Sequence, residues 1–451
     1  MSERRVILHH AGTVLVGQLA VMAFGITDTW VAARYADTAL AALSVASATY
    51  ITVHISLMGI LQALLPVWAE LHGADKPREL GRSVRQSLYV WLLTSVMAIV
   101  LLLSPGPLLH WTGVPDALQA DVREYLAIVA IAAPASLMFR LYGSLNQALG
   151  KPKLVTGLQV GALGVKIPLS LLLVMGWPGV LPPMGLAGCA WATVVVNLGM
   201  LAAALMLVRK SSFYRPFALW QKMEPPHWPT LKTFMRLGIP SGLTIGVEVT
   251  SFTLVALFVA RLGVVASASH QIMANMAAVL YMVPLSLSIA SSARISWWLG
   301  SGQPTKARHS LHTGLSMVLA SSVGLALCIW AMREGVAGFY TRSSQVLPLA
   351  TWMLGWLAIY HIVDALQVFL VFTLRCYRVT VLPLVVYTVM LWGVGLGGGY
   401  QLAYAEWPWA AEIGLAVHSP LSFWHAAIVA LTLTCAVLAP RLRSSSRRRT
   451  S

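Results

Sequence analysis

GLTIGVEVTSFTLVALFVA, residues 242–260, is apolar apart from small polar side chains and a single charged residue, Glu248. A helix of about 20 apolar residues spans a hydrocarbon core about 30 Å thick. A charge at the centre of such a helix costs about 2.5–3.5 kcal/mol on insertion scales, so intramembrane acids are rare and functional. The stretch therefore predicts a transmembrane helix whose acid takes part in a mechanism.

The rest of the chain has the composition of a polytopic membrane protein. Of its 451 residues, 58% are hydrophobic and only 10% are charged. Apolar runs of spanning length recur roughly twelve times between short polar breaks. The sequence thus predicts an all-α membrane protein with about twelve transmembrane helices. The expected spans are residues 10–33, 39–69, 86–104, 121–147, 153–177, 184–208, 233–261, 266–297, 309–332, 345–374, 380–401 and 419–439.

The net charge of +16 is explained by membrane topology. With the N-terminus inside, the loops that contain Lys76, Lys151 and Lys210 and the basic tail 441–451 lie on one side, and the opposite loops carry few cations. Cytoplasmic loops of membrane proteins have this excess of Lys and Arg. We therefore expect both termini in the cytoplasm, the lipid bilayer as the partner of the basic segments, and no nucleic acid.

The sequence contains no motif of catalysis or cofactor binding. Its four cysteines, Cys189, Cys328, Cys376 and Cys435, form no CxxC pair, which argues against a disulfide framework and a structural metal site. Walker A sequences, nucleotide-binding glycine loops and nucleophile elbows are absent as well. We expect a protein that is not an enzyme and that has no cofactor.

The two halves of the chain are copies of each other. A constant offset of 227 residues aligns Ala33 and Arg34 with Ala260 and Arg261, Gly73 with Gly300, Pro77 with Pro304, and Gly150 and Lys151 with Tyr377 and Arg378. Because each copy has six spans, both enter the membrane in the same orientation. The repeat predicts two six-helix bundles related by a pseudo-two-fold axis along the membrane normal, with a substrate site between them. The predicted domains are the bundles 1–212 and 233–440, the linker 213–232 and the tail 441–451.

In the second half, polar residues form one face on each of two spans. Ser241, Thr244, Glu248 and Ser251 recur at helical spacing on the seventh span. On the tenth span, His361, Asp364 and Gln367 form a similar stripe, and Arg375 follows on the same helix. Glu248 and Asp364 could bind a proton, or a transient Na⁺ through their oxygens; the alternative is a structural, hydrogen-bonded acid pair. His361 has the same two interpretations, site-shaping or structural.

In the first half, an acid and a lysine occur at comparable depth. Asp28 is the only acid within the spans of this half at the depth of the lysine, and Lys166 and Ser170 lie four residues apart on the fifth span. A lysine inside a membrane needs an anion, so Asp28 is its expected partner. Two interpretations are open, a static ion pair and a pair that proton uptake by Asp28 breaks.

With these residues in hand, the chain resembles the multidrug and toxic compound extrusion (MATE) family, in particular its NorM-like bacterial branch. The third of four matching segments is the most specific, because it combines Glu248 with a following HQ pair and an LGSGQP loop. The segments are residues 17–43, residues 149–170 with 184–197, residues 247–275 with 282–307, and residues 363–378.

The resemblance implies a monomeric antiporter of the bacterial inner membrane that exports drugs, toxic compounds or organic cations in exchange for H⁺ or Na⁺. It also implies site residues. Asp28, Glu248 and Asp364 match the family's acids on the first, seventh and tenth helices, and the remaining matches that we expect to shape the site are Gln271, Asn275, Arg375 and Tyr377. The alternative within the same superfamily is a flippase of lipid-linked sugars or a metabolite exporter, which Lys166 and Arg140 favour.

The chain departs from the family on the fifth helix. The family usually has two polar or acidic residues there, whereas this chain has Lys166 and Ser170. A lysine beside Asp28 repels a metal cation and disfavours simple organic cations as substrates. We therefore expect ion coupling at Glu248 and Asp364.

Overall fold

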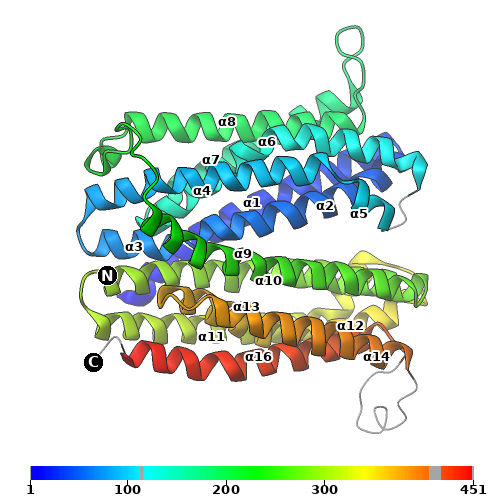
Figure 1. Ribbon diagram of the computed structural model, residues 1–451. Helices are drawn as coiled ribbons and strands as arrows, with labels where there is room; N and C mark the ends of the chain where they lie inside the picture. The colour runs from blue at the N-terminus through cyan, green and yellow to red at the C-terminus, as the bar shows by residue number, and fades with distance from the viewer. Residues whose placement is uncertain (1, 112–114, 406–417, 449–451) are drawn as a thin grey trace. The chain divides into compact units, whose positions relative to one another are not determined.

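The computed structural model describes residues 2–111, 115–405 and 418–448, and these residues are almost entirely helical. Twelve of the described helical segments are long and apolar enough to cross a membrane (Figure 1). This confirms the predicted fold class. The segments are α1 (Glu3–Tyr35), α2 with α3 (Asp37–Gln62, Leu65–Gly73), α4 (Pro77–Leu103), α6 (Asp116–Ala148), α7 (Pro152–Met175), α8 (Leu186–Lys210), α9 (Trp228–Ala260), α10 (Val264–Gly300), α11 (Pro304–Tyr340), α12 (Val346–Cys376), α13 with η2 and α14 (Val381–Tyr387, Thr388–Gly398, Gly399–Tyr404) and α16 (Leu421–Arg448).

Most helices extend beyond the predicted spans. The first begins at Glu3 instead of residue 10, and α11 covers Pro304–Tyr340 instead of 309–332. Hydrophobicity marks only the part of a helix that lies in hydrocarbon, whereas the backbone hydrogen bonds continue into polar turns on either side. The short helices α5 (Gly106–Trp111) and η1 (Ser212–Phe217) lie between spans.

The internal repeat is present in the backbone. Three pairs of landmarks that are 227 residues apart have the same structure: the helix ends Gly73 and Gly300, the helix starts Pro77 and Pro304, and the loop residues Asp75 (φ 52°) and Gly302 (φ 70°). A left-handed φ favours glycine, and Asp is among the few other residue types that adopt it readily. The predicted alignment of the halves is confirmed at these positions.

The chain forms two compact units, Gly12–Gly242 and the described parts of Met1–Ala11 with Leu243–Ser451. The first helix of each half contributes to both units. The start of α1 belongs with the second unit, where Ile7 and Ala11 join a buried cluster with Phe369. The start of α9 belongs with the first unit. There Gly242 lies so close to α2 that a Cβ atom would come within 2.6 Å of the Ser56 carbonyl oxygen.

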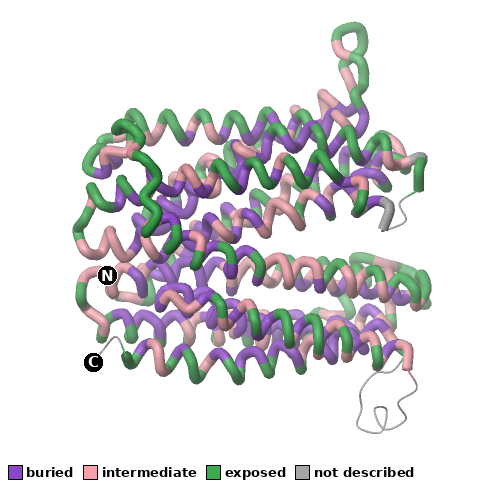
Figure 2. The backbone as a smooth tube through the Cα atoms, in the orientation of Figure 1, coloured by how far each residue is buried: buried purple, intermediate pink, exposed green. Residues whose placement is uncertain are grey.

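The fourth span of each half is the central helix of its unit. Helix α6 packs against α2, α4 and α8, and α12 packs against α10, α11 and α16. The most apolar windows of these two helices are 72% and 78% buried, more than those of the other spans. On outer helices such as α8, exposed residues alternate with buried ones (Figure 2). The exposed side chains there include Val195 and Leu198, which suit contact with lipid.

The segment after α8 is held against α4. The Arg85 guanidinium donates hydrogen bonds to both Glu224 carboxylate oxygens, at 2.6 and 3.1 Å, and to the Ala218 carbonyl oxygen at 2.6 Å. Helix η1 approaches so closely that a Cβ atom on Gly81 would lie 1.7 Å from the Phe217 carbonyl oxygen. Much of the predicted linker is therefore packed on the first unit.

Candidate functional site

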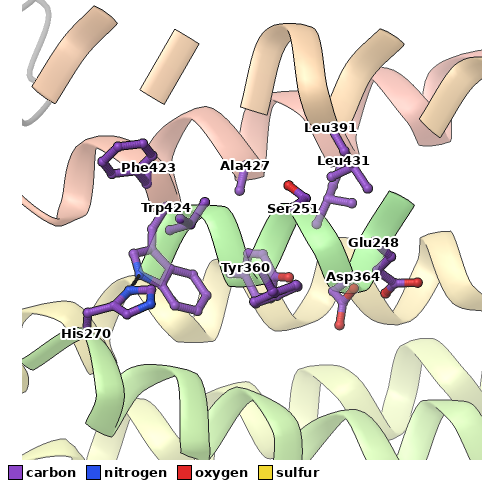
Figure 3. Close-up of a pocket in the computed structure, with 12 residues that line it drawn as sticks. Glu248, Ser251, His270, Tyr360, Asp364, Leu391, Phe423, Trp424, Ala427 and Leu431 are labelled. Atoms are coloured by element: carbon purple, nitrogen blue, oxygen red, sulfur yellow. Dashed lines mark hydrogen bonds between the residues drawn. The ribbon is translucent and has the colours of Figure 1, made fainter. Parts of the chain in front are cut away.

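A cavity in the second unit contains both acids that were expected to couple ions. Helix α9 contributes Glu248 and Ser251, one turn apart, and α12 contributes Tyr360 and Asp364, also one turn apart (Figure 3). The volume of the cavity is about 40 Å³. By this measure a water molecule needs about 10–15 Å³. The cavity has room for an ion or a few waters. The other lining residues are Phe252, Val255, His270, Leu391, Phe423, Trp424, Ala427 and Leu431.

The two carboxylates lie side by side at one end of the cavity (Figure 3). Among the residues that the structure describes, Glu248 and Asp364 form no ion pair. Asp364 is only 5% exposed. Two neighbouring acids in a low-dielectric site repel each other when both are ionised. Binding a cation between them, or a proton on one of them, removes this repulsion.

Aromatic rings form the other end of the cavity. The Trp424 indole donates a hydrogen bond of 3.1 Å to His270 Nδ1, and the Tyr360 and Trp424 rings meet edge to face at 5.0 Å. Since Nδ1 accepts the indole proton, a neutral His270 carries its own proton on Nε2. The cavity is thus charged at one end and aromatic at the other.

The expected ion pair in the first unit is present. Lys166 Nζ lies 2.8 Å from Asp28 Oδ1, and Ser170 Oγ donates to the same oxygen at 3.4 Å. The ammonium also donates to Thr193 Oγ1 at 2.7 Å and to the Cys189 carbonyl oxygen at 3.3 Å. Lys166 is only 1% exposed. The pair confirms the predicted partner of the lysine, whereas its behaviour on proton uptake stays a prediction.

Comparison with known proteins identifies the family. The family model described as MatE matches residues 14–172 and 240–400, which is most of both repeats. The chain belongs to the MATE family of transporters. It is 34% identical to the "Probable multidrug resistance protein NorM" of Aromatoleum aromaticum, over 98% of this chain and 94% of that protein. It is 30% identical to "Multidrug resistance protein PmpM" of Pseudomonas aeruginosa, over 99% and 92%.

The fold is that of solved MATE structures. The crystal structure of the Vibrio cholerae MATE transporter VcmN in the bent form matches with a TM-score of 0.85 at 17% identity, over 99% of this chain and 98% of that one. The family assignment confirms the predicted resemblance to NorM-like transporters. A member of this family is a transporter and not an enzyme.

Six predicted site residues in the second half of this MATE transporter lie outside the cavity lining. They are Gln271, Asn275, His361, Gln367, Arg375 and Tyr377. Gln271 and Asn275 are exposed and hydrogen-bonded to each other at 3.0 Å. The Arg375 guanidinium lies 4.6 Å from the Phe372 ring centroid. These side chains therefore do not line the cavity, although Arg375 lies within electrostatic range of Glu248.

The cavity of the MATE transporter contains residues that sequence reasoning missed. Tyr360 and His270 each precede a predicted residue by one position, and one residue along a helix turns the side chain by about 100°. Trp424 lies on the last span, beyond the segments that carried the resemblance. The aromatic character of these residues gave no signal, since aromatic residues occur throughout the spans.

A π-helix lies beside the same cavity. Segment η2 (Thr388–Gly398) carries Leu391 into the lining, and its Trp392 indole donates to the Val247 carbonyl oxygen at 3.2 Å. Segments of π-helix are rare and are frequent at functional sites. Gly399, the last residue of the run GLGGG (395–399), packs closely on Phe423 of α16.

Proposed function

We propose that this protein exports amphipathic and cationic small molecules from the cytoplasm, in exchange for H⁺ or Na⁺ bound at Glu248 and Asp364. The observation that carries this proposal is a pair of carboxylates in a cavity inside the spans of the second unit, neither of which forms an ion pair with any residue that the structure describes. The names of the relatives, multidrug resistance proteins, support the substrate class.

The size of the cavity supports ion coupling at this site. At about 40 Å³, the cavity has room for an ion or a few water molecules, each of which needs about 10–15 Å³ by the same measure. An ion or proton fits, and the aromatic end offers an apolar surface once the cavity widens. Neutralising the two acids lowers the free energy of closing the cavity around them, because desolvating charged carboxylates is costly.

The first unit is less suited to ion coupling. Asp28 is already neutralised by Lys166 at 2.8 Å and receives a further hydrogen bond from Ser170. A metal cation entering there would meet the ammonium group at close range. We therefore assign coupling to the second unit, and we propose that access alternates by rocking of one half against the other.

The basic loops and the tail 441–451 support an orientation with both termini in the cytoplasm. Relatives from bacteria support residence in the bacterial inner membrane. An engineered single cysteine in the tail, labelled with a membrane-impermeant maleimide, tests this orientation. Labelling in right-side-out vesicles would contradict it.

The test of function is efflux of a cationic dye from proteoliposomes under an imposed Na⁺ or pH gradient. We expect gradient-driven transport by the wild type and its loss in Glu248→Gln and in Asp364→Asn. Glu334→Gln is the control, since Glu334 is an exposed acid on α11. The gradient that drives transport identifies the coupling ion. Full transport by both cavity variants, inserted at wild-type levels, would overturn the proposal.

A further inference from the structure

A second cation lies inside the spans of the first unit. Arg140 is on α6, eight residues before the last residue of the helix, Ala148, and at 1.5 Å per residue this places it about 12 Å from the end of the helix. In the described part of the chain, Arg140 forms no ion pair. Asp28, the only acid of this half at comparable depth within the spans, is held by Lys166. The first unit therefore keeps one positive charge without a counterion.

The surroundings of Arg140 offer hydrogen bonds but no carboxylate. Ser136 precedes it by one turn on α6, and its Oγ lies 3.5 Å from His54 Nδ1 on α2. Tyr50, one turn before His54, stacks on the imidazole with ring centroids 5.2 Å apart. His54 lies within electrostatic range of Arg140. We refer to Tyr50, His54, Ser136 and Arg140 as the Arg140 cluster.

The cluster is accessible although it lies at membrane depth. Tyr50, His54 and Arg140 are all half-buried, and only Ser136 is buried. A guanidinium in this position is expensive to leave uncompensated. Its planar donor pair matches the two oxygens of a carboxylate. An accessible cation with hydroxyl and imidazole neighbours has the chemistry of an anion site.

The repeat shows that the charge is specific to the first half. The residue 227 positions after Arg140 is Gln367, which occupies the equivalent place on α12 and is fully buried. The same position of the fold thus accepts a neutral amide. At this position the two units therefore differ, with a guanidinium in the first and a neutral amide in the second.

We propose that the Arg140 cluster binds the carboxylate group of acidic or zwitterionic amphipathic substrates. This proposal adds a substrate class to the proposed export function. Transport of such substrates depends on that function, whereas their binding does not. The guanidinium holds the carboxylate through paired charge-assisted hydrogen bonds, and the apolar part of the substrate lies along the half-buried surface beside Tyr50. Substrates without an acid would not gain from the cluster.

The test uses two probes that differ at one group. Rhodamine 110 has a free carboxylate, and rhodamine 123 is its methyl ester. Binding to the purified full-length protein in lipid nanodiscs is measured by fluorescence polarisation. We expect the wild type to bind the acid about tenfold more tightly than the ester, the effect of one charge-assisted contact. Arg140→Gln should remove this preference and keep ester binding. Arg140→Lys should keep part of the preference for the acid. The control Arg123→Gln, at an exposed position on α6, should keep all of this preference.

Retained ester binding shows that Arg140→Gln is folded. Two results would overturn the inference. In the first, Arg140→Gln still prefers the acid as strongly as the wild type does. In the second, Arg140→Gln loses affinity for both probes equally, while Arg140→Lys binds both as the wild type does. Efflux of the same probes separates it from the proposed function. Arg140-dependent binding without transport of either probe would refute export and leave the subsite intact. Transport of both probes by the wild type with equal affinity would refute the subsite and leave export intact.

Discussion

Lys166 on α7 and Asp28 on α1 form an ion pair with a distance of 2.8 Å, and the lysine is almost completely buried. This relationship separates the two halves of the repeat. In the first half the intramembrane acid is compensated by a cation, whereas in the second half two acids line a cavity without one. A pair that is compensated and buried is suited to holding α1 and α7 together.

The first prediction concerns this pair. Lys166→Gln should destabilise the protein by about 3–5 kcal/mol, because it leaves the Asp28 carboxylate buried without a counterion. Thermal unfolding in detergent measures the loss. The double variant Asp28→Asn with Lys166→Gln should recover most of it, since neither charge remains. If the double variant is as unstable as the single one, the lost contacts of Lys166 with Thr193 and Cys189 dominate instead.

The second prediction concerns the contact between α4 and η1. Gly81→Ala should destabilise the first unit by about 1–3 kcal/mol, the usual effect of overpacking. The added Cβ atom meets a backbone carbonyl oxygen of Phe217, which cannot rotate away. Gly157→Ala on α7 is the matched control, because nothing lies within 4 Å of its Cβ position. It should be neutral or slightly stabilising, since alanine favours helix. Equal melting temperatures for the two variants would contradict the close contact.

The third prediction concerns pH and the segment held by α4. Hydrogen bonds from Arg85 hold the pKa of Glu224 below its ordinary value of 4.5. A carboxyl whose pKa is lowered on folding stabilises the protein above its unfolded pKa, and this contribution is lost as the pH falls through the lowered folded value. The melting temperature of the wild type should therefore exceed that of Glu224→Gln at neutral pH, and the difference should shrink below pH 4.5. A difference that is independent of pH would exclude the ionised carboxylate as its source.

The fourth prediction concerns the start of α1. Glu3 accepts hydrogen bonds from Arg294 at 2.8 Å, Trp298 at 3.2 Å and Ser310 at 2.6 Å, all within the second unit. Glu3→Gln should loosen the first turns of this helix and raise their amide hydrogen exchange about tenfold, as expected for loss of a charge-assisted contact. Hydrogen exchange by mass spectrometry follows residues 3–11. Arg4→Gln is the control, because Arg4 is exposed. Unchanged exchange in Glu3→Gln would show that apolar packing alone anchors this segment.

The sequence by itself determined the class of the molecule, the repeat and the identity of the unusual residues. Hydrocarbon tolerates few polar groups, so an acid such as Glu248 or a lysine such as Lys166 stands out against its span. The same scarcity made the partner of Lys166 predictable, because Asp28 was the only acid available at comparable depth. The equivalence of Gly73 and Gly300 was predictable from the repeat, whereas the predicted spans stopped short of these helix ends, at residues 69 and 297.

Only the tertiary structure decided which side chains share a cavity. His270 contacts Trp424 from a helix far away in sequence, while Gln271, the next residue, is exposed. The direction of a side chain depends on how each helix is rotated against its neighbours, and that rotation follows from packing along its whole length. Most of the surface of these helices is apolar, so apart from the polar faces on α9 and α12 no periodicity in the sequence records the rotation. The unusual polar residues inside the membrane spans were therefore predictable from the sequence. The cavity that brings Glu248, Asp364 and the aromatic residues together could be found only from the tertiary structure.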